Sequence, residues 1–178
     1  MKLVILDRDG VINADSDSFI KCTSEWVPLP GSLEAIADLT NAGMTVAVAT
    51  NQSGLARGLL DVDTLNRIHA LMVSKVAAIG GQIDAIAFCP HGPWQDCDCR
   101  KPAPGLLLSL AGRFSVPLKG VPLVGDSVRD MEAAASVGAT PILVRSGKGQ
   151  KAAQQLPPAL AGITIVDDLR AAVQFILR

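Results

Sequence analysis

Short apolar runs that are rich in valine and isoleucine recur along the chain, and polar segments separate them. Six of these runs predict strands, at residues 3–7, 44–50, 83–88, 120–126, 140–145 and 163–168. Such short runs, bounded by turn-forming residues, favour strands over helices. Because they are apolar throughout rather than alternating, they are typical of strands that are covered on both faces, as in a parallel sheet.

Helical spacing of apolar residues marks the segments between these runs. In residues 32–43 the apolar positions Leu33, Ile36 and Leu39 fall on one face, and Gly43 follows as a stop signal. The same kind of pattern predicts helices at residues 61–80, 103–115, 128–138 and 167–177. Strand and helix alternate, which predicts an α/β fold: a Rossmann-like parallel sheet with helices on both faces.

Two segments fit neither pattern. Residues 13–30 predict a loop between the first strand and the first helix, and the polar residues 146–158 predict a surface loop with a short helix. The first segment is too short to form a large cap domain over the sheet. With 178 residues and no internal repeat, we expect a single domain over residues 1–178.

Composition and charge narrow the range of partners. Aromatic residues are scarce, with four Phe, two Trp and no Tyr, so the core must consist of aliphatic side chains. The net charge of -1 and the lack of a long basic run give no reason to expect nucleic acid or an anionic membrane as a partner. No apolar run approaches the ~18 residues of a membrane-spanning helix, and the run at residues 3–6 is too short for a secretory signal. We expect a cytoplasmic monomer that acts on a small molecule.

Polar residues follow the predicted strands. Residues 7–10 follow the first strand, residues 50–54 the second and residues 125–127 the fourth, with Asp130 one turn on. Arg100 and Lys101 come from the stretch after the third strand; ligands of open α/β sheets bind beyond the carboxyl ends of the strands. If the strands lie side by side, these groups converge on one crevice.

The chemistry of this crevice suits phosphoryl transfer. Several carboxylates at one point repel each other unless a cation joins them, and oxygen ligands suit Mg²⁺. The ammonium of Lys101 supplies a point positive charge for a phosphoryl oxygen. Arg100 supplies a planar guanidinium that can donate two hydrogen bonds at once, and Thr50 supplies a neutral hydroxyl donor. Asp7 and Asp9 are two apart and would face the same side of an extended chain, so one can attack phosphorus while the other handles a proton.

Each of these segments also has a simpler interpretation. "DRDG" is typical of a strand end with a tight turn, and "GDSVRD" of a helix start that Asp126 or Ser127 caps. Lys101 alone could be an ordinary solvated lysine. The joint arrangement is more specific, because each element follows or adjoins a predicted strand.

The stretch "CPHGPWQDCDCRKP", residues 89–102, concentrates cysteine and histidine. Three thiolates and one imidazole form a closed Cys₃His set, which suits a structural Zn²⁺. A disulfide or free thiols are the alternatives, but reduced cytosolic conditions and a short spacing favour the metal. We interpret the set as a clamp that positions Arg100 and Lys101. The predicted ligands are Cys89, His91, Cys97 and Cys99.

Four segments resemble, in order, the motifs of the haloacid dehalogenase-like (HAD) phosphatase superfamily. They are "LDRDG" (6–10), "ATN" (49–51), Lys101 and "GDSVRD" (125–130), and the resemblance covers nearly the whole chain. Within the superfamily, "NQSGLARG", "CPH" with "CDCRKP", and "VRSGK" are similar to the family of D-glycero-D-manno-heptose 1,7-bisphosphate phosphatases. The histidinol-phosphate phosphatases are related and have a similar metal loop; "SGLARG" favours the heptose family.

The resemblance implies a role for individual residues. Asp7 is expected to be the nucleophile and Asp9 the general acid and base, with Thr50 and Lys101 stabilising the phosphoryl group. The implied Mg²⁺ ligands are Asp7, the backbone carbonyl of Asp9, and Asp126. Position 127 is Ser where some members of the group have lysine, so no ligand role is expected there. The implied substrate contacts are Arg8, Asp15, Ser18, Asn51, Gln52, Ser53, Arg57 and Arg100.

The resemblance also implies an activity. We expect a Mg²⁺-dependent hydrolase that removes the 7-phosphate of a heptose 1,7-bisphosphate through an aspartyl-phosphate, for lipopolysaccharide core heptose synthesis. A histidinol-phosphate phosphatase is the main alternative. A non-catalytic, zinc-stabilised binding module is disfavoured because Asp7 and Asp9 are both present. A phosphomutase-like transferase is disfavoured because no cap domain is expected to exclude water. His69, in the middle of a predicted helix, is expected to be at the surface or partly buried and to have no catalytic role.

Overall fold

Six strands form one parallel sheet at the centre of the molecule. The computed structural model describes residues 2–178. The strands are β1 (Lys2–Leu6), β2 (Met44–Asn51), β3 (Ala85–Cys89), β4 (Pro122–Gly125), β5 (Thr140–Val144) and β6 (Thr164–Val166). Their order is β3-β2-β1-β4-β5-β6, and every neighbouring pair is parallel. All six predicted strands are confirmed.

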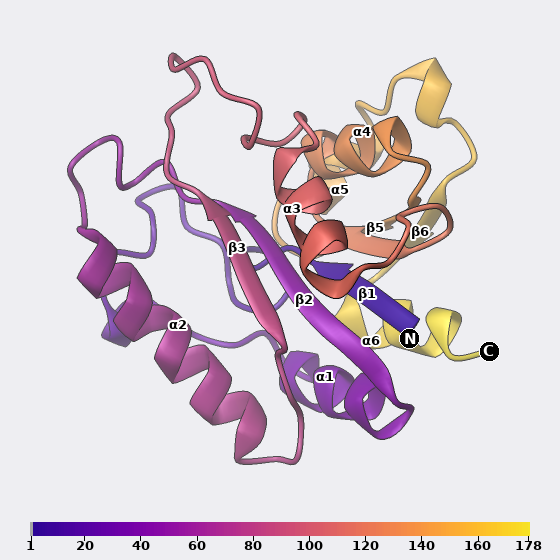
Figure 1. Cartoon of the computed structure of the whole chain (residues 1–178), viewed down its shortest axis with the longest axis horizontal. Coiled ribbons are helices and arrows are strands. Elements are labelled where there is room, and N and C mark those ends of the chain that lie inside the picture. The colour runs from indigo at the N-terminus through magenta and orange to yellow at the C-terminus, as the bar shows by residue number, and fades with distance from the viewer. Residues whose placement is uncertain (1) are drawn as a thin grey trace.

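Helices cover both faces of the sheet, as predicted (Figure 1). One face carries α1 (Ser32–Asn41), α2 (Val62–Ala77) and α6 (Leu169–Ile176). The other carries α3 (Gly105–Phe114), α4 (Val128–Ser136) and α5 (Gly149–Ala153). The short helix predicted within the polar segment is α5. Two 3-10 helices, η1 (Thr23–Glu25) and η2 (Pro158–Leu160), lie in connecting loops.

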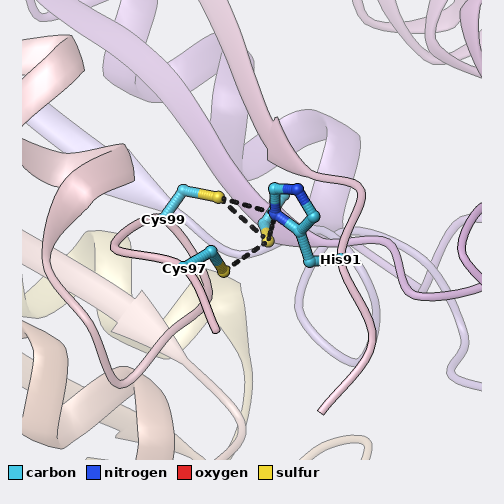
Figure 2. A group of neighbouring side chains, drawn as sticks. His91, Cys97 and Cys99 are labelled. Atoms are coloured by element: carbon cyan, nitrogen blue, oxygen red, sulfur yellow. Dashed lines mark hydrogen bonds between the residues drawn. The ribbon is translucent and has the colours of Figure 1, made fainter. Parts of the chain in front are cut away.

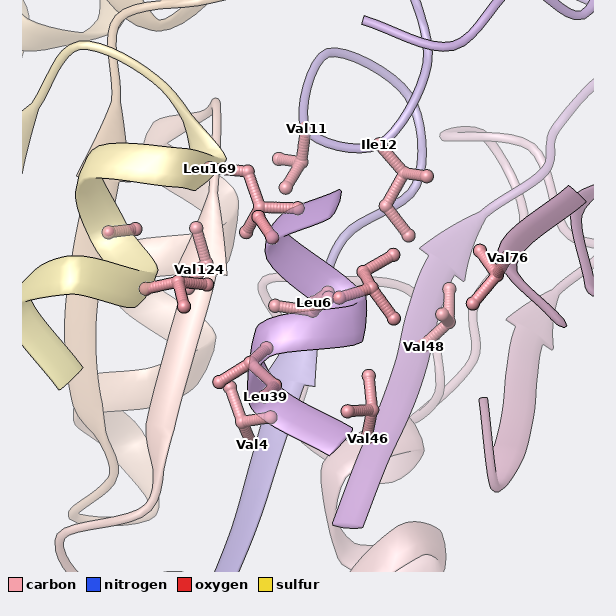
Figure 3. Packing of buried hydrophobic residues seen from close by; sticks show 14 of the residues in the cluster. Val4, Leu6, Val11, Ile12, Leu39, Val46, Val48, Val76, Val124 and Leu169 are labelled. Carbon is pink, nitrogen blue, oxygen red and sulfur yellow. The ribbon is translucent and has the colours of Figure 1, made fainter. Parts of the chain in front are cut away.

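The period of two along β1 divides the core into two layers. Val4 and Leu6 are buried in the layer beneath α1, α2 and α6, where Leu39 and Val46 meet them (Figure 3). Ile5 points to the opposite layer, beneath α3, α4 and α5. Because both faces are covered, the strand is apolar throughout, and each buried aliphatic side chain contributes about 1.5–3 kcal/mol.

The excursion between β1 and α1 remains a loop, as expected. Within residues 13–30 the structure forms η1 and isolated bridges from Asn13 to Pro28 and to Asp9. Trp26, in this loop, is buried against the first core layer. Across residues 2–178, none of the helices combines the length and apolar character that crossing a membrane requires.

The strand order decides where side chains from distant parts of the chain meet. β1 lies between β2 and β4, so the carboxyl ends of these three strands are neighbours. The connection after β1 runs to β2 on one side, and the connection after β4 runs to β5 on the other, so the chain diverges between β1 and β4, which is where open α/β sheets bind ligands. The loop after β3 rises from the same end of the sheet, at the top of Figure 1.

Candidate active site

A polar cavity of about 130 Å³ opens at the carboxyl ends of β1, β2 and β4. It brings together most of the side chains that the sequence predicted for the site. The predicted residues that line it are Asp7, Asp9, Asp15, Thr50, Asn51, Gln52, Ser53, Arg100, Lys101 and Asp126. Segments separated by more than a hundred residues therefore meet in one site, as the strand order requires.

Three of the predicted substrate contacts do not line this cavity. Arg8 is fully buried beneath it. Ser18 is exposed, and its neighbour Ser16 lines the cavity instead. Arg57 is also exposed and packs its guanidinium against the rings of Phe19 and Trp94, at 5.4 and 4.7 Å from the ring centroids.

Asp7 follows β1 directly and is held on both sides. Its backbone N–H donates to the carbonyl of Val124 on β4 at 2.9 Å, which continues the sheet by one residue. Its Oδ1 accepts from the backbone N–H of Arg8 at 2.7 Å. Its Oδ2 lies 3.1 Å from Lys101 Nζ. The carboxylate therefore has a fixed orientation toward the cavity.

Lys101 is a buried cation at the floor of the cavity, with a side chain that is 2% exposed. Its ammonium reaches Asp7 at 3.1 Å, Asp130 at 2.5 Å and the carbonyl of Ala49 at 2.7 Å. Burial by itself would lower the pKa of Lys101, but Asp130 and Asp7 outweigh it and raise the pKa. The ammonium is therefore charged and its three donors are occupied.

Asp130 is a site residue to which the sequence analysis gave no role. It is fully buried, and one oxygen pairs with Lys101. The other accepts from the backbone N–H of Ser127 at 3.1 Å and from its hydroxyl at 2.6 Å. Asp130 thus closes a capping box at the start of α4 and also neutralises the lysine. The spacing from Ser127 to Asp130 in "GDSVRD" indicated a helix cap. The contact between Asp130 and Lys101 could be seen only in the folded structure.

Asp7, Asp126 and Asp130, the acid cluster, have carboxylate oxygens within 4.8 Å of one another. Three carboxylates against the one ammonium of Lys101 leave two negative charges uncompensated. Burial, together with repulsion from the neighbouring carboxylates, raises the pKa of Asp7 well above its usual range and that of Asp126 to about 7. A divalent cation with a preference for oxygen ligands fits this donor set and charge.

The Asp9 carboxylate lines the same cavity but is not part of the acid cluster, and other side chains hold it. Arg8 donates to it from Nη2 at 2.9 and 3.0 Å and from Nε at 3.2 Å. Asn13 donates at 2.9 Å and Gln52 at 2.8 Å. Burial would raise the pKa of Asp9, but Arg8 and these hydrogen bonds outweigh it and lower the pKa. Only the backbone carbonyl of Asp9 was predicted as a ligand, so the orientation of its side chain leaves that prediction open.

The end of β2 connects the two halves of the site. Asn51 holds the Lys101 peptide from both sides, because its Nδ2 donates to the Lys101 carbonyl and its Oδ1 accepts from the Lys101 N–H, each at 3.1 Å. Gln52 bridges Asp9 to the hydroxyl of Thr50, donating to the latter at 2.9 Å. The "ATNQ" segment therefore positions the lysine and the second aspartate together.

Gly10 and the "VRSGK" segment enclose Asp126. Gly10 has a φ of +79°, and a Cβ there would overlap the Asp126 carboxylate. On the other side, the backbone N–H of Lys148 donates to Asp126 Oδ2 at 2.8 Å, while its ammonium lies 2.8 Å from Asp15. Lys148 lines the cavity and was not among the predicted site residues. Its position depends on the approach of β5 to β4, which local sequence does not reveal.

Cys89, His91, Cys97 and Cys99, the cysteine–histidine cluster, converge as predicted (Figure 2). All four cysteines of the chain are free thiols. Within the cluster, Cys89 Sγ lies 3.1 Å from Cys99 Sγ and 3.9 Å from Cys97 Sγ, and His91 Nδ1 lies 3.3 Å from Cys99 Sγ. Tetrahedral zinc with Zn–S bonds of about 2.3 Å has ligand-to-ligand edges of about 3.8 Å. The cluster fits Zn²⁺.

The cysteine–histidine cluster is connected to the cavity through covalent neighbours and hydrogen bonds. Cys89 is the last residue of β3, and its carbonyl accepts from the N–H of Gln52 at 2.8 Å. Cys99 is followed directly by Arg100, whose Nη1 donates to the His91 carbonyl at 3.1 Å. Arg100 lines the cavity. A metal that fixes this loop would therefore fix Arg100 and Lys101 as well.

Comparison with known proteins gives one consistent group. Residues 98–172 match the HAD-hydrolase-like family model. The D-glycero-beta-D-manno-heptose-1,7-bisphosphate 7-phosphatase of Bordetella bronchiseptica is 54% identical over 100% of this chain and 99% of its own length. The enzyme of the same name from Pseudomonas putida is 54% identical over 96% of this chain and 97% of its own length.

Solved structures agree with the sequence relatives. The D,D-heptose 1,7-bisphosphate phosphatase of B. bronchiseptica, in a complex with magnesium and phosphate, superposes with a TM-score of 0.95 at 55% identity, over 99% of this chain and 98% of that one. The corresponding phosphatase of Burkholderia thailandensis gives a TM-score of 0.77 at 45% identity, over 99% of both chains.

Proposed function

Because this chain belongs to the family of D-glycero-beta-D-manno-heptose-1,7-bisphosphate 7-phosphatases, which are HAD-like phosphomonoester hydrolases, we propose that it removes the 7-phosphate of this β-anomer and leaves the 1-phosphate in place. The observation that carries this proposal is the placement of Asp7. It lies at the carboxyl end of the central strand, beside a buried lysine and an acid cluster, in an open polar cavity.

In the first half-reaction, a carboxylate oxygen of Asp7 attacks the phosphorus of the 7-phosphate. A P–O bond to Asp7 forms while the bond between phosphorus and the sugar O7 breaks, and the electron pair remains on O7. Asp9, in its protonated form, gives its proton to this oxygen. The products are an aspartyl-phosphate and the free 7-hydroxyl of the sugar 1-phosphate.

In the second half-reaction, water hydrolyses the aspartyl-phosphate. Asp9, now a carboxylate, takes a proton from water as its oxygen attacks phosphorus, and the bond to Asp7 breaks. Inorganic phosphate leaves and Asp7 regains its carboxylate. The contacts from Arg8, Asn13 and Gln52 stabilise the carboxylate form of Asp9, which is the form that this step uses.

Fixed donors around Asp7 would stabilise the transferring phosphoryl group. Lys101 already lies 3.1 Å from Asp7 Oδ2 and would offset charge on a phosphoryl oxygen beside it. Thr50 is oriented by Gln52 and offers its hydroxyl at the cavity wall. These groups need no rearrangement at the moment of reaction, because β2 and the Asn51 contacts hold them.

Asp7 and Asp126 of the acid cluster, with the backbone carbonyl of Asp9, would hold the Mg²⁺ of the proposed reaction, while Asp130 remains paired with Lys101. When bound, the ion would offset the charge between the carboxylates and the phosphoryl oxygens. The B. bronchiseptica relative, solved with magnesium and phosphate, supports this assignment. Among the predicted ligands, Asp7 and Asp126 contribute carboxylates that belong to the cluster.

We further propose a structural role for Zn²⁺ at the cysteine–histidine cluster. Four protein donors close a tetrahedral site and leave no position for water, so the metal would act as a clamp on the loop. The direct continuation from Cys99 to Arg100 and Lys101 supports this role.

The setting of the enzyme belongs to the same proposal. We propose that residues 1–178 act as a single domain and as a cytoplasmic monomer, whose product is used for lipopolysaccharide core heptose synthesis. One continuous sheet with a core layer on each face supports the single domain. The resemblance to the heptose phosphatases supports the biosynthetic role.

Phosphate release from three substrates tests the proposed activity. The purified protein with Mg²⁺ would be given the β-anomer of D-glycero-D-manno-heptose 1,7-bisphosphate, the α-anomer and histidinol phosphate in parallel. We expect the highest kcat/KM for the β-anomer. Preference for histidinol phosphate would overturn the substrate assignment while keeping the fold and the proposed role of Asp7.

A further inference from the structure

Arg8 is a buried cation that reaches only two side chains through its guanidinium. Nε and Nη2 face the carboxylate of Asp9, with contacts of 2.9 to 3.2 Å, and Nη1 lies 3.2 Å from Nε2 of His69. The residue is fully buried, so water is not at hand to replace either partner. A buried N–H left without an acceptor costs about 1–3 kcal/mol. The two contacts therefore fix the plane of the guanidinium.

The contact also determines the proton position on His69. Arginine keeps its protons, so Nη1 donates and His69 Nε2 accepts, which places the imidazole proton on Nδ1 and leaves the ring neutral. Burial, reinforced by the charge of Arg8, lowers the pKa of His69 to about 4, in agreement with a neutral ring. The ring is packed against Phe88 of β3, with centroids 6.0 Å apart. His69 is 7% exposed, which is more buried than the sequence suggested.

We propose that His69 is a positioning residue for the reaction: it orients the Arg8 guanidinium, which in turn holds both oxygens of Asp9 in place for proton transfer. This inference rests on the proposed function, because it needs Asp9 as the general acid. Neither His69 nor Arg8 lines the cavity, so neither contacts the substrate. The role goes beyond the expectation that Arg8 binds substrate and that His69 takes no part in the reaction.

Loss of the His69 acceptor should slow proton transfer by Asp9 without weakening substrate binding. Without His69 Nε2, the Arg8 Nη1 group has no acceptor in its buried position. The guanidinium then rotates toward another acceptor. The bidentate contact with Asp9 weakens, while the donors from Asn13 and Gln52 remain. Asp9 then occupies a wider range of orientations. The step that needs its proton slows, and the affinity for substrate is retained.

The choice of leaving group separates this role from a purely structural one. The sugar alkoxide needs a proton to leave, whereas 4-nitrophenolate does not. We would measure first-turnover rates by rapid quench with the heptose bisphosphate and with 4-nitrophenyl phosphate, for His69→Leu, His69→Gln and Phe88→Leu. Gln can present an acceptor near the position of Nε2, Leu cannot, and Phe88→Leu alters the packing of the ring but keeps its acceptor.

We expect His69→Leu to lower the heptose bisphosphate rate about tenfold, less than the 10²–10⁴ that general acid–base catalysis contributes as a whole. Its 4-nitrophenyl phosphate rate and its apparent substrate affinity should stay within about twofold of the parent. His69→Gln should recover most of the rate, and Phe88→Leu should show no dependence on leaving group.

Two results would overturn the inference, and a fourth variant, Asp9→Asn, distinguishes the failure of the inference from the failure of the proposed function. Equal slowing of both substrates by His69→Leu, or a His69→Gln variant no better than His69→Leu, assigns His69 to packing alone. Asp9→Asn calibrates the assay, because it should slow the sugar substrate far more than the aryl one. If Asp9→Asn slows both equally, the acid role of Asp9 fails and the positioning role fails with it.

Discussion

The cysteine–histidine cluster and the acid cluster are both suited to metals, yet they are assembled in opposite ways. The first comes from one short segment, the end of β3 and the loop after it, in which all four ligands lie within residues 89–99. The second joins Asp7 after β1, Asp126 after β4 and Asp130 in α4. The spacing along the chain is therefore enough to identify the first cluster, whereas the second exists only because the strand order places β4 beside β1.

The two clusters also differ in how they carry charge. Burial raises the pKa of Cys89 and raises that of Cys99 to about 12, so without a metal these two thiols stay protonated and neutral. Burial would also raise the pKa of Cys97, but hydrogen bonds from the Arg100 backbone and the neighbouring thiols outweigh it and lower the pKa. The acid cluster instead lies beside the permanent positive charge of Lys101, and its three carboxylates, when all are ionised, exceed that charge by two. One cluster is thus suited to holding a loop and the other to meeting a charged substrate.

The largest effect is expected from the nucleophile in the acid cluster. Asp7→Asn should lower kcat roughly 10⁴-fold or more, the scale seen when a catalytic nucleophile is removed. The variant should fold normally, because the amide removes repulsion with Asp126 and Asp130. Phosphate release and the thermal midpoint measure the two properties. Substantial residual turnover in a folded variant would contradict the assignment of Asp7.

The next largest effect is expected at Asp130, which belongs both to the acid cluster and to the α4 cap. Asp130→Ala leaves the buried Lys101 ammonium without its nearest partner, and breaking a buried ion pair costs about 3–5 kcal/mol. Ser127→Ala, the matched control, loses only the hydroxyl contact with the cap and should cost about 1 kcal/mol. Chemical denaturation compares the two variants. Equal costs would show that the lysine contact adds little.

A smaller effect is expected when the cysteine–histidine cluster is broken. Cys97→Ser should lose bound zinc and lower kcat by up to about 10², because Arg100 and Lys101 follow the cluster and small displacements in a site are costly. Cys22→Ser is the control, since Cys22 lies outside the cluster. Metal analysis and steady-state kinetics measure the outcome. Full activity in a zinc-free Cys97→Ser protein would refute the clamp.

The smallest effect is expected at Arg57, which packs against Trp94 in the loop that carries the cysteine–histidine cluster. Its guanidinium lies over the Trp94 and Phe19 rings, and the residue does not line the cavity. Arg57→Ala should therefore change kcat and KM for the heptose bisphosphate by less than about threefold, as for removal of one exposed cation–π contact. A large rise in KM would mean that Arg57 swings inward and contacts the substrate, as its motif suggests.

The pattern of apolar residues in the sequence was sufficient to predict the strands, the helices and the fold class, but not the order of the strands in the sheet. Fully apolar runs gave all six strands, because a sheet covered on both faces needs no polar alternation. Glycine stops gave helix ends to within a few residues, as at Gly43, which lies just beyond α1. These signals are local, so they can be interpreted without knowing which elements pack against one another.

The contents of the site were only partly predictable. The strand ends identified Asp7 and Asp126, because polar residues directly after apolar runs are conspicuous, whereas Lys101 was identified from its place beside the cysteine-rich segment and from the family resemblance. The pairing of Asp130 with Lys101 and that of His69 with Arg8 are contacts between distant elements. No spacing rule encodes such contacts, and their residues look like an ordinary cap and an ordinary helix position.

The direct test of the central claim is to trap the intermediate. Asp9→Asn protein would be mixed with Mg²⁺ and 4-nitrophenyl phosphate, quenched in acid, digested and analysed by mass spectrometry. The aryl leaving group needs no proton, so the first step can proceed in this variant, whereas the base that hydrolyses the intermediate is missing; a phosphoryl group is therefore expected on the peptide that contains Asp7. An unmodified Asp7 peptide under conditions in which 4-nitrophenolate has been released would contradict the proposed mechanism.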